Sequence, residues 1–169
     1  MHTLKSLWQY ALLLTLSTSI MAQPGQAELT VWVSEAVVTT YTFNHNNFME
    51  RQKNIAQYFT ADGWTAYSKA LIASKLQDTV MKNEYEVSAV PTMPPDIKSL
   101  GQDRWQASMP ILVVYQNPQS QQKQTLDVTI QFTKAASGQG VRGLAIMSLQ
   151  SKVIKPVLKC VSEDNEKSN

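Results

Sequence analysis

The sequence predicts an α+β domain in which three N-terminal helices pack on a curved four-stranded antiparallel sheet. Up to about residue 74, apolar side chains recur every three to four positions, as they do along one face of a helix. From residue 84 onward they alternate with polar side chains, as they do in half-buried strands. Helices that come first, followed by strands joined through short loops, indicate helices layered on one face of an antiparallel sheet.

The first predicted helix spans residues 29–43, within a stretch that is also rich in the β-branched residues that favour strands. Val33, Val37 and Tyr41 repeat at intervals of four, and this repeat favours the helix. The polar residues 23–28 before it contain proline and glycine, and we interpret them as a linker.

Two further helices follow. The second is expected over residues 47–59, where Phe48 and Ile55 lie on one face while charged and amide side chains occupy the other. The third is expected over residues 62–74. Beyond it the apolar stripe rotates to another face, so residues 75–82 are predicted to form a short continuation or a turn.

The four predicted strands cover residues 84–90, 104–115, 125–133 and 141–149. Three prolines that follow residue 90 predict a loop between the first two strands. Pro110 falls inside the second strand, where a proline cannot donate to the ladder. Its position therefore predicts an edge strand or a bulge at this point.

The chain is organised around an elbow between the second and third helices. The elbow comprises seven residues: Phe59, Thr60, Asp62, Gly63, Trp64, Tyr67 and Leu71. Thr60 and Asp62 can each accept hydrogen bonds from the free N–H groups that begin a helix. Gly63 permits a close approach of a second backbone or a bulky ring. The aromatic residues supply the apolar area that would hold the helices against the sheet.

The two ends of the chain are predicted to lie outside the domain, which spans residues 29–150. Residues 1–22 combine a basic start, a short apolar run and small residues before Ala22, which is typical of a secretory signal peptide. An uncleaved anchor is the alternative, although the apolar run falls short of the roughly 20 residues needed to span a bilayer. Residues 151–169 are expected to form a loosely held tail.

Cys160 lies in this tail and is the only cysteine, so it cannot form an internal disulfide. In an exported protein its thiol either pairs with another chain or stays free and buried. The apolar residues beside it favour the buried thiol: Val157, Leu158 and Val161.

Composition and motifs exclude several classes of function. The chain has 15 Lys+Arg against 13 Asp+Glu, a net charge of +2, which disfavours a nucleic-acid partner. His45 is the single histidine after the leader and lies in a polar loop, so a catalytic triad or a zinc site is not expected. Phosphate-binding, dinucleotide-binding and nucleophile-elbow motifs are absent from the sequence. No catalytic, cofactor-binding or metal-binding residue is therefore predicted.

One alternative function stays open. A cone-shaped domain of this size can enclose an apolar pocket, and isomerases of the ketosteroid type use a carboxylate and a tyrosine in such a pocket. Several tyrosines are available, but no carboxylate is clearly directed inward. We favour aromatic residues that fill the core over a small-molecule binder or an isomerase.

An ordered set of residues resembles the DotI/IcmL family of type IVB secretion and conjugation systems. The resemblance covers about residues 31–149 and rests on Trp32, Ala36-Val37, Tyr41-Thr42-Phe43, Tyr58-Phe59-Thr60, Gly63-Trp64, Tyr67, Ala70-Leu71, Ser74, Trp105, Pro110, Tyr115 and the Leu126–Ile130 strand. It implies a cone-shaped fold similar to nuclear transport factor 2, as in the periplasmic part of VirB-type assembly factors. It also implies a non-enzymatic domain that needs no cofactor and that binds secretion components or itself.

The resemblance places the protein in the periplasm of a Gram-negative bacterium, with membrane association only if the leader is retained. The family's core member carries a transmembrane helix where this chain has a signal-like leader, which favours a stand-alone periplasmic paralogue. Two surfaces are expected to bind partners: an edge strand interrupted at Pro110 and the helix-covered face around Trp64. We expect Trp64 and Trp105 in the core, and Trp32 partly exposed as a candidate interface residue.

Overall fold

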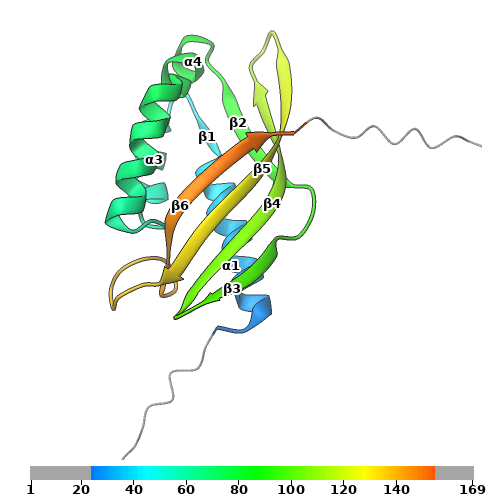
Figure 1. Ribbon diagram of the computed structural model, residues 1–169. Helices are drawn as coiled ribbons and strands as arrows, with labels where there is room; N and C mark the ends of the chain where they lie inside the picture. Colours follow the sequence, from blue (N-terminus) through cyan, green and yellow to red (C-terminus); the bar gives the residue numbers. More distant parts are fainter. Residues whose placement is uncertain (1–23, 155–169) are drawn as a thin grey trace, which may run out of the picture.

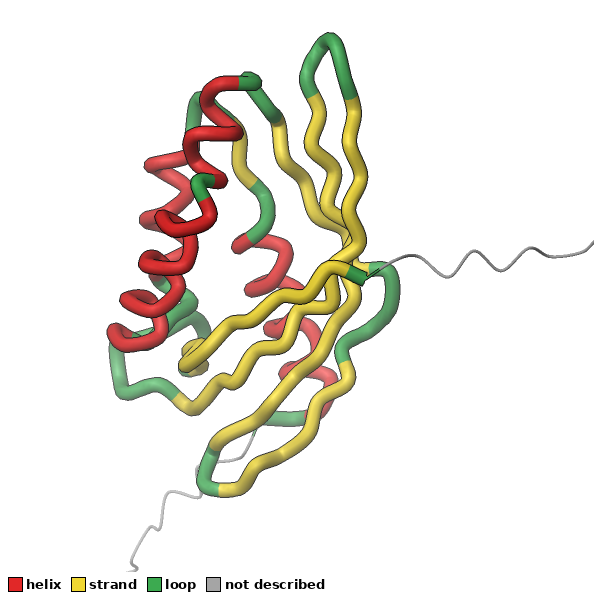
Figure 2. The backbone as a smooth tube through the Cα atoms, turned by 45° about the horizontal axis from the view of Figure 1, so that its top comes forward, coloured by secondary structure: helices red, strands yellow, loops and turns green. Residues whose placement is uncertain are grey.

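A layer of helices and a curled antiparallel sheet form the described part of the chain, residues 24–154, in this computed structural model. Figure 1 shows α1 lying across the inner side of the sheet, while α3 and α4 run along its open side. Figure 2, turned by 45°, shows the sheet bending around α1 like part of a barrel. The predicted α+β class is confirmed, with more helices and strands than expected.

The helices are α1 (Gln26–Thr40), α2 (Phe48–Ala56), α3 (Ala61–Ser74) and α4 (Leu76–Lys82). The strands are β1 (Phe43–Asn44), β2 (Glu86–Pro91), β3 (Asp96–Gly101), β4 (Arg104–Gln116), β5 (Gln121–Lys134) and β6 (Leu144–Val153). They pair antiparallel in the order β1-β2-β4-β5-β6, and β3 pairs with the other end of β4. The sheet thus consists of long hairpins whose inner face receives α1.

The helical layer differs from the prediction at two points. Lys75 adopts a left-handed conformation with φ of 54°, which ends α3 and makes α4 a separate helix, so the described chain has four helices instead of three. The first helix begins at Gln26 and therefore includes residues 26–28, which we had interpreted as linker.

The sheet has two strands that the apolar pattern missed. β3 lies within the loop predicted after the prolines, and its side chains are almost all exposed, so it has no alternating signal to detect. β1 is only two residues long. The last strand also runs beyond the predicted end to Val153, so residues 151–153 belong to the sheet and not to the tail. The predicted leader 1–22 and the remaining tail 155–169 lie outside the described residues.

Pro110 lies inside the central strand β4, so the prediction of an edge position is wrong. Its carbonyl accepts a hydrogen bond from the Thr92 N–H at 3.0 Å, which shows that its backbone faces the β2–β3 connection and not β5. On that side β4 changes partner, from β2 at Ile111 to β3 at Ser108. The ladder is already interrupted there, and the missing N–H leaves no strand acceptor unpaired.

Trp32 is a core residue, which corrects the expectation that it is partly exposed. Its side chain is 1% exposed, and its ring lies 5.0 Å from that of Phe132. The indole N–H donates to the Val141 carbonyl at 2.8 Å, so the polar end of the side chain is also satisfied. Trp32 therefore connects α1 both to β5 and to the loop before β6. Trp105 is buried, as expected, and Trp64 is partly buried.

The elbow docks on the edge of β6 through its backbone. The Thr60 N–H donates to the Ile146 carbonyl at 2.9 Å, and the Ile146 N–H donates to the Tyr58 carbonyl at 2.7 Å. The Thr60 hydroxyl caps α3 by accepting from the Gly63 N–H at 3.1 Å. Asp62, the other residue expected to cap, instead lies in the first turn of α3 with its side chain exposed.

Gly63 is where α3 passes directly over β6. A Cβ atom at this position would lie 2.5 Å from the Ile146 carbonyl oxygen and 2.8 Å from that of Met147. Both neighbours are backbone atoms that are held in the sheet, so neither can move aside cheaply.

A charged cluster joins α1 to the same region. The Tyr58 hydroxyl donates to one Glu35 oxygen at 2.6 Å, and Arg142 donates to the other at 2.5 Å. These two bonds, Tyr58 first, lower the pKa of Glu35 below its ordinary value of 4.5. The Glu35 side chain is 41% exposed, so solvent screens the pair.

Replacing Trp32 by Ala should lower the free energy of unfolding by about 3–5 kcal/mol, because it leaves a large cavity in the core. Trp32→Phe should cost clearly less, since it keeps most of the ring and loses the bond to Val141. Urea unfolding followed by circular dichroism measures both. A Trp32→Ala variant as stable as wild type would show that the indole is not in the core.

Gly63→Ala should destabilise the protein by about 1–3 kcal/mol through overpacking against the β6 backbone. In an ordinary exposed helix the same change would stabilise by roughly 0.5–1 kcal/mol, so the sign of the effect is diagnostic. Gly25→Ala is the matched control, because a Cβ there has no neighbour within 4 Å. A gain in stability for Gly63→Ala in urea unfolding would contradict the docking.

The Glu35 cluster should make stability depend on acid. A folded-state pKa that is lowered stabilises the protein above pH 4.5, and this contribution disappears as the pH falls through the lowered value. We expect Glu35→Gln to lose less than about 1 kcal/mol at pH 7, because the pair is half exposed, and this difference from wild type should shrink as the pH falls below 4.5. Urea unfolding at pH 7, 4.5 and 3 tests this, with Glu50→Gln as control. A difference that is independent of pH would exclude the charge as its cause.

Candidate interaction site

The seven elbow residues form a structural joint with little free surface. Phe59, Trp64 and Tyr67 make an aromatic cluster, with ring centroids 5.0–5.9 Å apart. Leu71 is partly buried against the core one turn further along α3. Thr60 and Gly63 serve the contact with β6. The helix-covered face around Trp64 therefore offers mainly the edges of packed rings to a partner.

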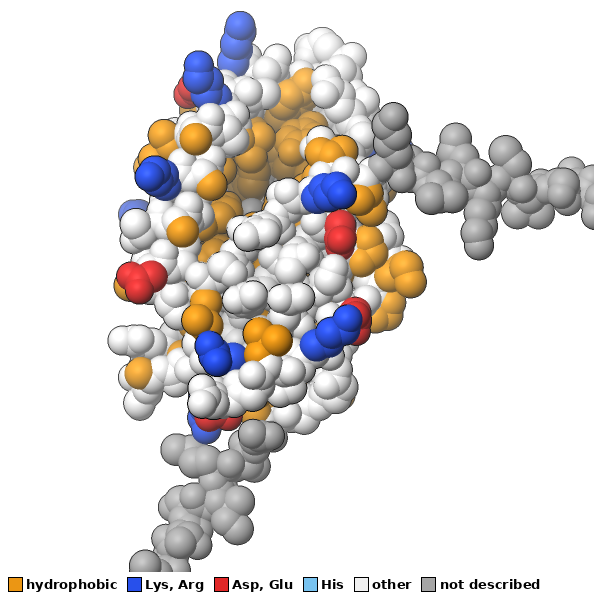
Figure 3. All heavy atoms as spheres, in the orientation of Figure 1, with side chains coloured by type: hydrophobic (Ala, Val, Ile, Leu, Met, Phe, Trp, Pro, Cys, Tyr) orange, Lys and Arg blue, Asp and Glu red, His pale blue; other side chains and the backbone are white. Residues whose placement is uncertain are grey.

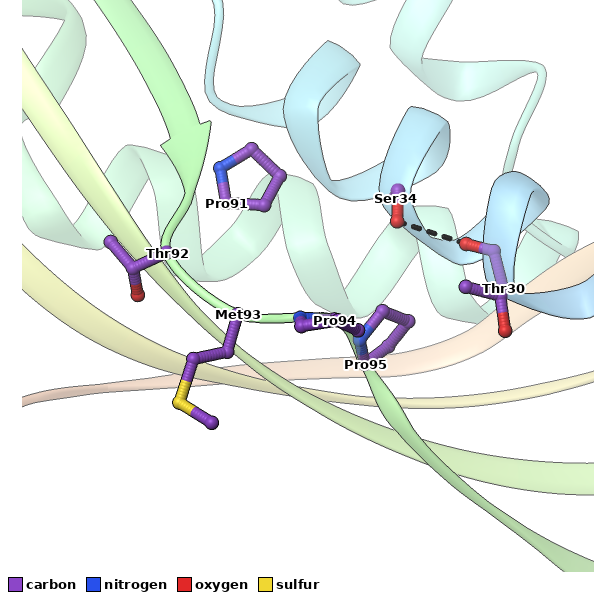
Figure 4. A pocket seen from close by; sticks show the side chains of 7 residues that line it. All are labelled: Thr30, Ser34, Pro91, Thr92, Met93, Pro94 and Pro95. Atoms are coloured by element: carbon purple, nitrogen blue, oxygen red, sulfur yellow. Dashed lines mark hydrogen bonds between the residues drawn. The ribbon is translucent and has the colours of Figure 1, made fainter.

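A shallow pocket of about 390 Å³ opens instead between α1 and the connection from β2 to β3. We name it the proline pocket. Its lining consists of Thr30, Ser34, Pro91, Thr92, Met93, Pro94 and Pro95 (Figure 4). None of the seven is charged. The Ser34 hydroxyl donates to the Thr30 carbonyl at 2.9 Å, so the α1 side of the pocket presents few free polar groups to a ligand or partner.

The rim of the proline pocket is apolar and exposed. Met93, one of the lining residues, is 64% exposed. The surrounding prolines restrict the backbone of the connection, while the methionine side chain is flexible and can adapt to different partners. Sequence reasoning treated this segment only as a loop. The signal available was a methionine between proline positions, which is unusual for a loop that merely connects two strands.

A second concave region lies at the other end of the domain. Figure 3 shows a hollow lined by hydrophobic side chains between the α3–α4 layer and the sheet. Tyr41 at the end of α1, Tyr67 on α3 and Tyr115 at the end of β4 are partly buried against the core. Burial raises the pKa of each of their hydroxyl groups. Their hydroxyls are therefore protonated at neutral pH.

The hollow shows that the interior is not sealed at this end, contrary to our expectation. In the view of Figure 3, however, no acidic side chain lies within it. The tyrosine–carboxylate pair that the structure does contain, Tyr58 with Glu35, lies at the loop before β6 and is half exposed. The arrangement needed for isomerase chemistry, a buried base beside a tyrosine, is thus not brought together by these residues.

Residues 24–154 contain neither a cluster of metal-ligating side chains nor a helix suited to span a membrane. In that range, no three residues among His, Cys, Asp and Glu are grouped as a metal site would require. His45 lies in the connection between α1 and α2, where its backbone N–H donates to the Tyr85 carbonyl at 3.1 Å. No helix within the same range is long and apolar enough to cross a bilayer.

Comparison with known proteins identifies close structural relatives. A crystal structure of an IcmL-like type IV secretion system protein from Legionella pneumophila is 55% identical, with a TM-score of 0.79; the match covers 82% of this chain and 100% of that one. The periplasmic domain of DotI is 27% identical, with a TM-score of 0.71, over 78% of this chain and 98% of that one. No curated protein sequence matches the chain.

More distant structures share the fold alone. A periplasmic fragment of TraM is 17% identical with a TM-score of 0.69, over 78% of this chain and all of the fragment. CagV, a VirB8 homologue from Helicobacter pylori, is 13% identical with a TM-score of 0.63, over 77% of this chain and all of CagV. The curled sheet with helices on its inner side is therefore the VirB8-like, nuclear transport factor 2-like fold that the sequence suggested.

The family assignment rests on the sequence as well as on the fold. Residues 12–153 match the profile of a family described as the type IVb secretion system, inner-membrane complex component. This range includes the elbow, both of its helices and every strand of the sheet. The chain therefore belongs to the DotI/IcmL family of type IVB secretion systems.

Proposed function

We propose that the protein is a non-enzymatic interaction module of the periplasm that works through protein–protein contacts in or beside a type IVB secretion complex. The observation that carries this proposal is the 55% identity to an IcmL-like secretion protein along that protein's whole crystallised length. The likeness to the periplasmic domain of DotI supports the compartment. Cleavage of residues 1–22 would release the domain as a stand-alone paralogue, whereas a retained leader would hold it at the inner membrane.

The proline pocket is the surface best suited to a protein partner. It combines a concave, uncharged lining with an exposed apolar side chain, that of Met93. Interfaces gain most of their free energy from a few apolar or aromatic anchors that fill such pockets. The expected partner is a secretion component that presents an apolar side chain on an extended or helical segment.

The alternative function, small-molecule binding, has one observation in its favour. The hollow between the α3–α4 layer and the sheet is lined by hydrophobic side chains in Figure 3, and concave apolar sites of this kind can hold a small molecule. The interaction module remains the better supported function, because it follows from the family as well as from a surface of the domain.

Met93→Glu should weaken capture of the partner about tenfold, because a charge at the rim must lose water in an apolar interface. Leu100→Glu is the matched control, since Leu100 is also an exposed apolar residue but lies on β3 outside the pocket. A photo-crosslinking residue at each position in the producing bacterium, followed by mass spectrometry, identifies the neighbours.

The expected result is crosslinking to a secretion-system protein from position 93 and not from position 100. Unfolding measurements should show both Glu variants within about 0.5 kcal/mol of wild type, as for ordinary surface changes. Equal capture by the two variants would remove the proline pocket from the proposal.

A further inference from the structure

β3 forms an open edge of the sheet. Among residues 24–154 it pairs with β4 alone, and Figure 2 shows it as the outermost strand where the two strands pair. All of its side chains are exposed except that of Ile97, which is partly buried against the core. An exposed edge of this kind presents unpaired backbone N–H and C=O groups to which another strand can bind.

The residues of β3 whose backbone groups point outward can be assigned from its pairing with β4. The Pro110 carbonyl accepts a hydrogen bond from the β2–β3 connection, so the backbone groups of Pro110 face the side of β4 on which β3 lies. Ser108, two residues away along the strand, faces the same side and pairs with Asp96. Because the direction alternates along a strand, Ile97 and Ser99 direct their N–H and C=O groups away from β4.

The charges of β3 are arranged so that the strand can pair with a second copy of itself. Asp96 and Lys98 lie on one face, form an ion pair at 3.3 Å and are 69% and 71% exposed. In an antiparallel pair of two β3 strands centred on Ile97, each Asp96 lies opposite the Lys98 of the other copy. Opposite charges at such positions stabilise strand pairing, and like charges weaken it. A register centred on Lys98 would place the two lysines opposite each other and is therefore disfavoured.

We propose that two copies of the protein associate through β3 in the register centred on Ile97, which joins their sheets across a twofold axis. The two Ile97 residues then exchange backbone hydrogen bonds in both directions, and each Ser99 N–H donates to the Pro95 carbonyl of the other copy. Pro95 itself has no N–H. No outward donor between Pro95 and Ser99 is left unpaired in this arrangement.

The Ile97 side chain also gains apolar contact in the dimer. Its neighbour across β4 is Ala107, which is 1% exposed, so Ile97 belongs to the face of the sheet that carries the core. At the twofold axis the two Ile97 side chains lie side by side, and each covers apolar surface that the other leaves in water. A strand pair this short buries less area than a stable interface, so the expected dimer is weak and reversible.

A second copy is favoured over another protein because the charges of β3 complement themselves in this register. The inference goes beyond the proposed function, in which the proline pocket binds another secretion component. Association of purified copies tests β3, whereas crosslinking from Met93 in the bacterium tests the proline pocket. Either result can therefore fail without the other.

Disulfide formation between copies tests the register. Cys160→Ser removes the only thiol of the chain, and one new cysteine is then placed on β3. With Ile97→Cys, the two Cα atoms at the axis lie about 5.5 Å apart, within the range that a disulfide spans. Ser99→Cys is the matched control, because its two copies lie about 13 Å apart, four residues along the strand. Under mild oxidation, we expect Ile97→Cys to form the disulfide dimer at least about tenfold faster.

A change of charge provides a second test that leaves Ile97 intact. Lys98→Glu places acidic side chains opposite each other and should raise the dissociation constant of the dimer about tenfold. Asp96→Lys combined with Lys98→Glu brings opposite charges together again and should restore the dissociation constant. Sedimentation equilibrium of the Cys160→Ser chain over a series of concentrations measures both effects, and urea unfolding verifies that the variants are folded.

Three results would overturn the proposal. The first is equal crosslinking of Ile97→Cys and Ser99→Cys, which would show that copies meet without this register. The second is a Cys160→Ser chain that stays monomeric over the whole series of concentrations. The third is a dimer whose dissociation constant is unchanged by Lys98→Glu, because such a dimer would use another surface.

Discussion

The exchange of backbone hydrogen bonds between the elbow and Ile146 is the contact on which the rest of the structure depends. It ties the short connection between α2 and α3 to the edge strand β6, 86 residues later in the chain. Gly63 makes this contact possible, because any side chain at that position would meet the β6 backbone. α3 could not lie along the open side of the sheet without it, and the hollow beside α3 would have no outer wall.

α1 provides the complementary contacts from inside the curl. Trp32 packs against β5 and bonds to the loop before β6, while Glu35 binds Arg142 of the same loop. Tyr58 joins the two systems, since its carbonyl belongs to the elbow and its hydroxyl binds Glu35. The loop that enters β6 is thus held by α1 and the elbow together.

Elements could be predicted from the sequence where one of their faces is buried, because burial makes apolar residues recur at regular intervals. Elements without a buried face carry no such repeat. The alternation predicted β4 to within one residue, because every second side chain along most of this strand is buried. It missed the first four residues of β5, whose side chains are mostly exposed and do not alternate. β3 has almost only exposed side chains, so its sequence shows no alternation of apolar and polar residues that would predict a strand. The exposure of Trp32 could not be predicted either, because a helix with buried residues around much of its circumference does not reveal which tryptophan faces the sheet. The proline pocket requires α1 and a distant loop to meet, which is information that only the fold contains.

Pro110 has a consequence for how members of this family can diverge. Pro110 has no backbone N–H, so β4 forms no regular strand pair at this point with the connection between β2 and β3. This connection can therefore change length without altering the register of β4 with β2 or with β3. Insertions and deletions between β2 and β3 should therefore accumulate more readily than anywhere else next to a central strand. The connection that lines the proline pocket could therefore differ from one paralogue to another while the sheet beneath it stays constant.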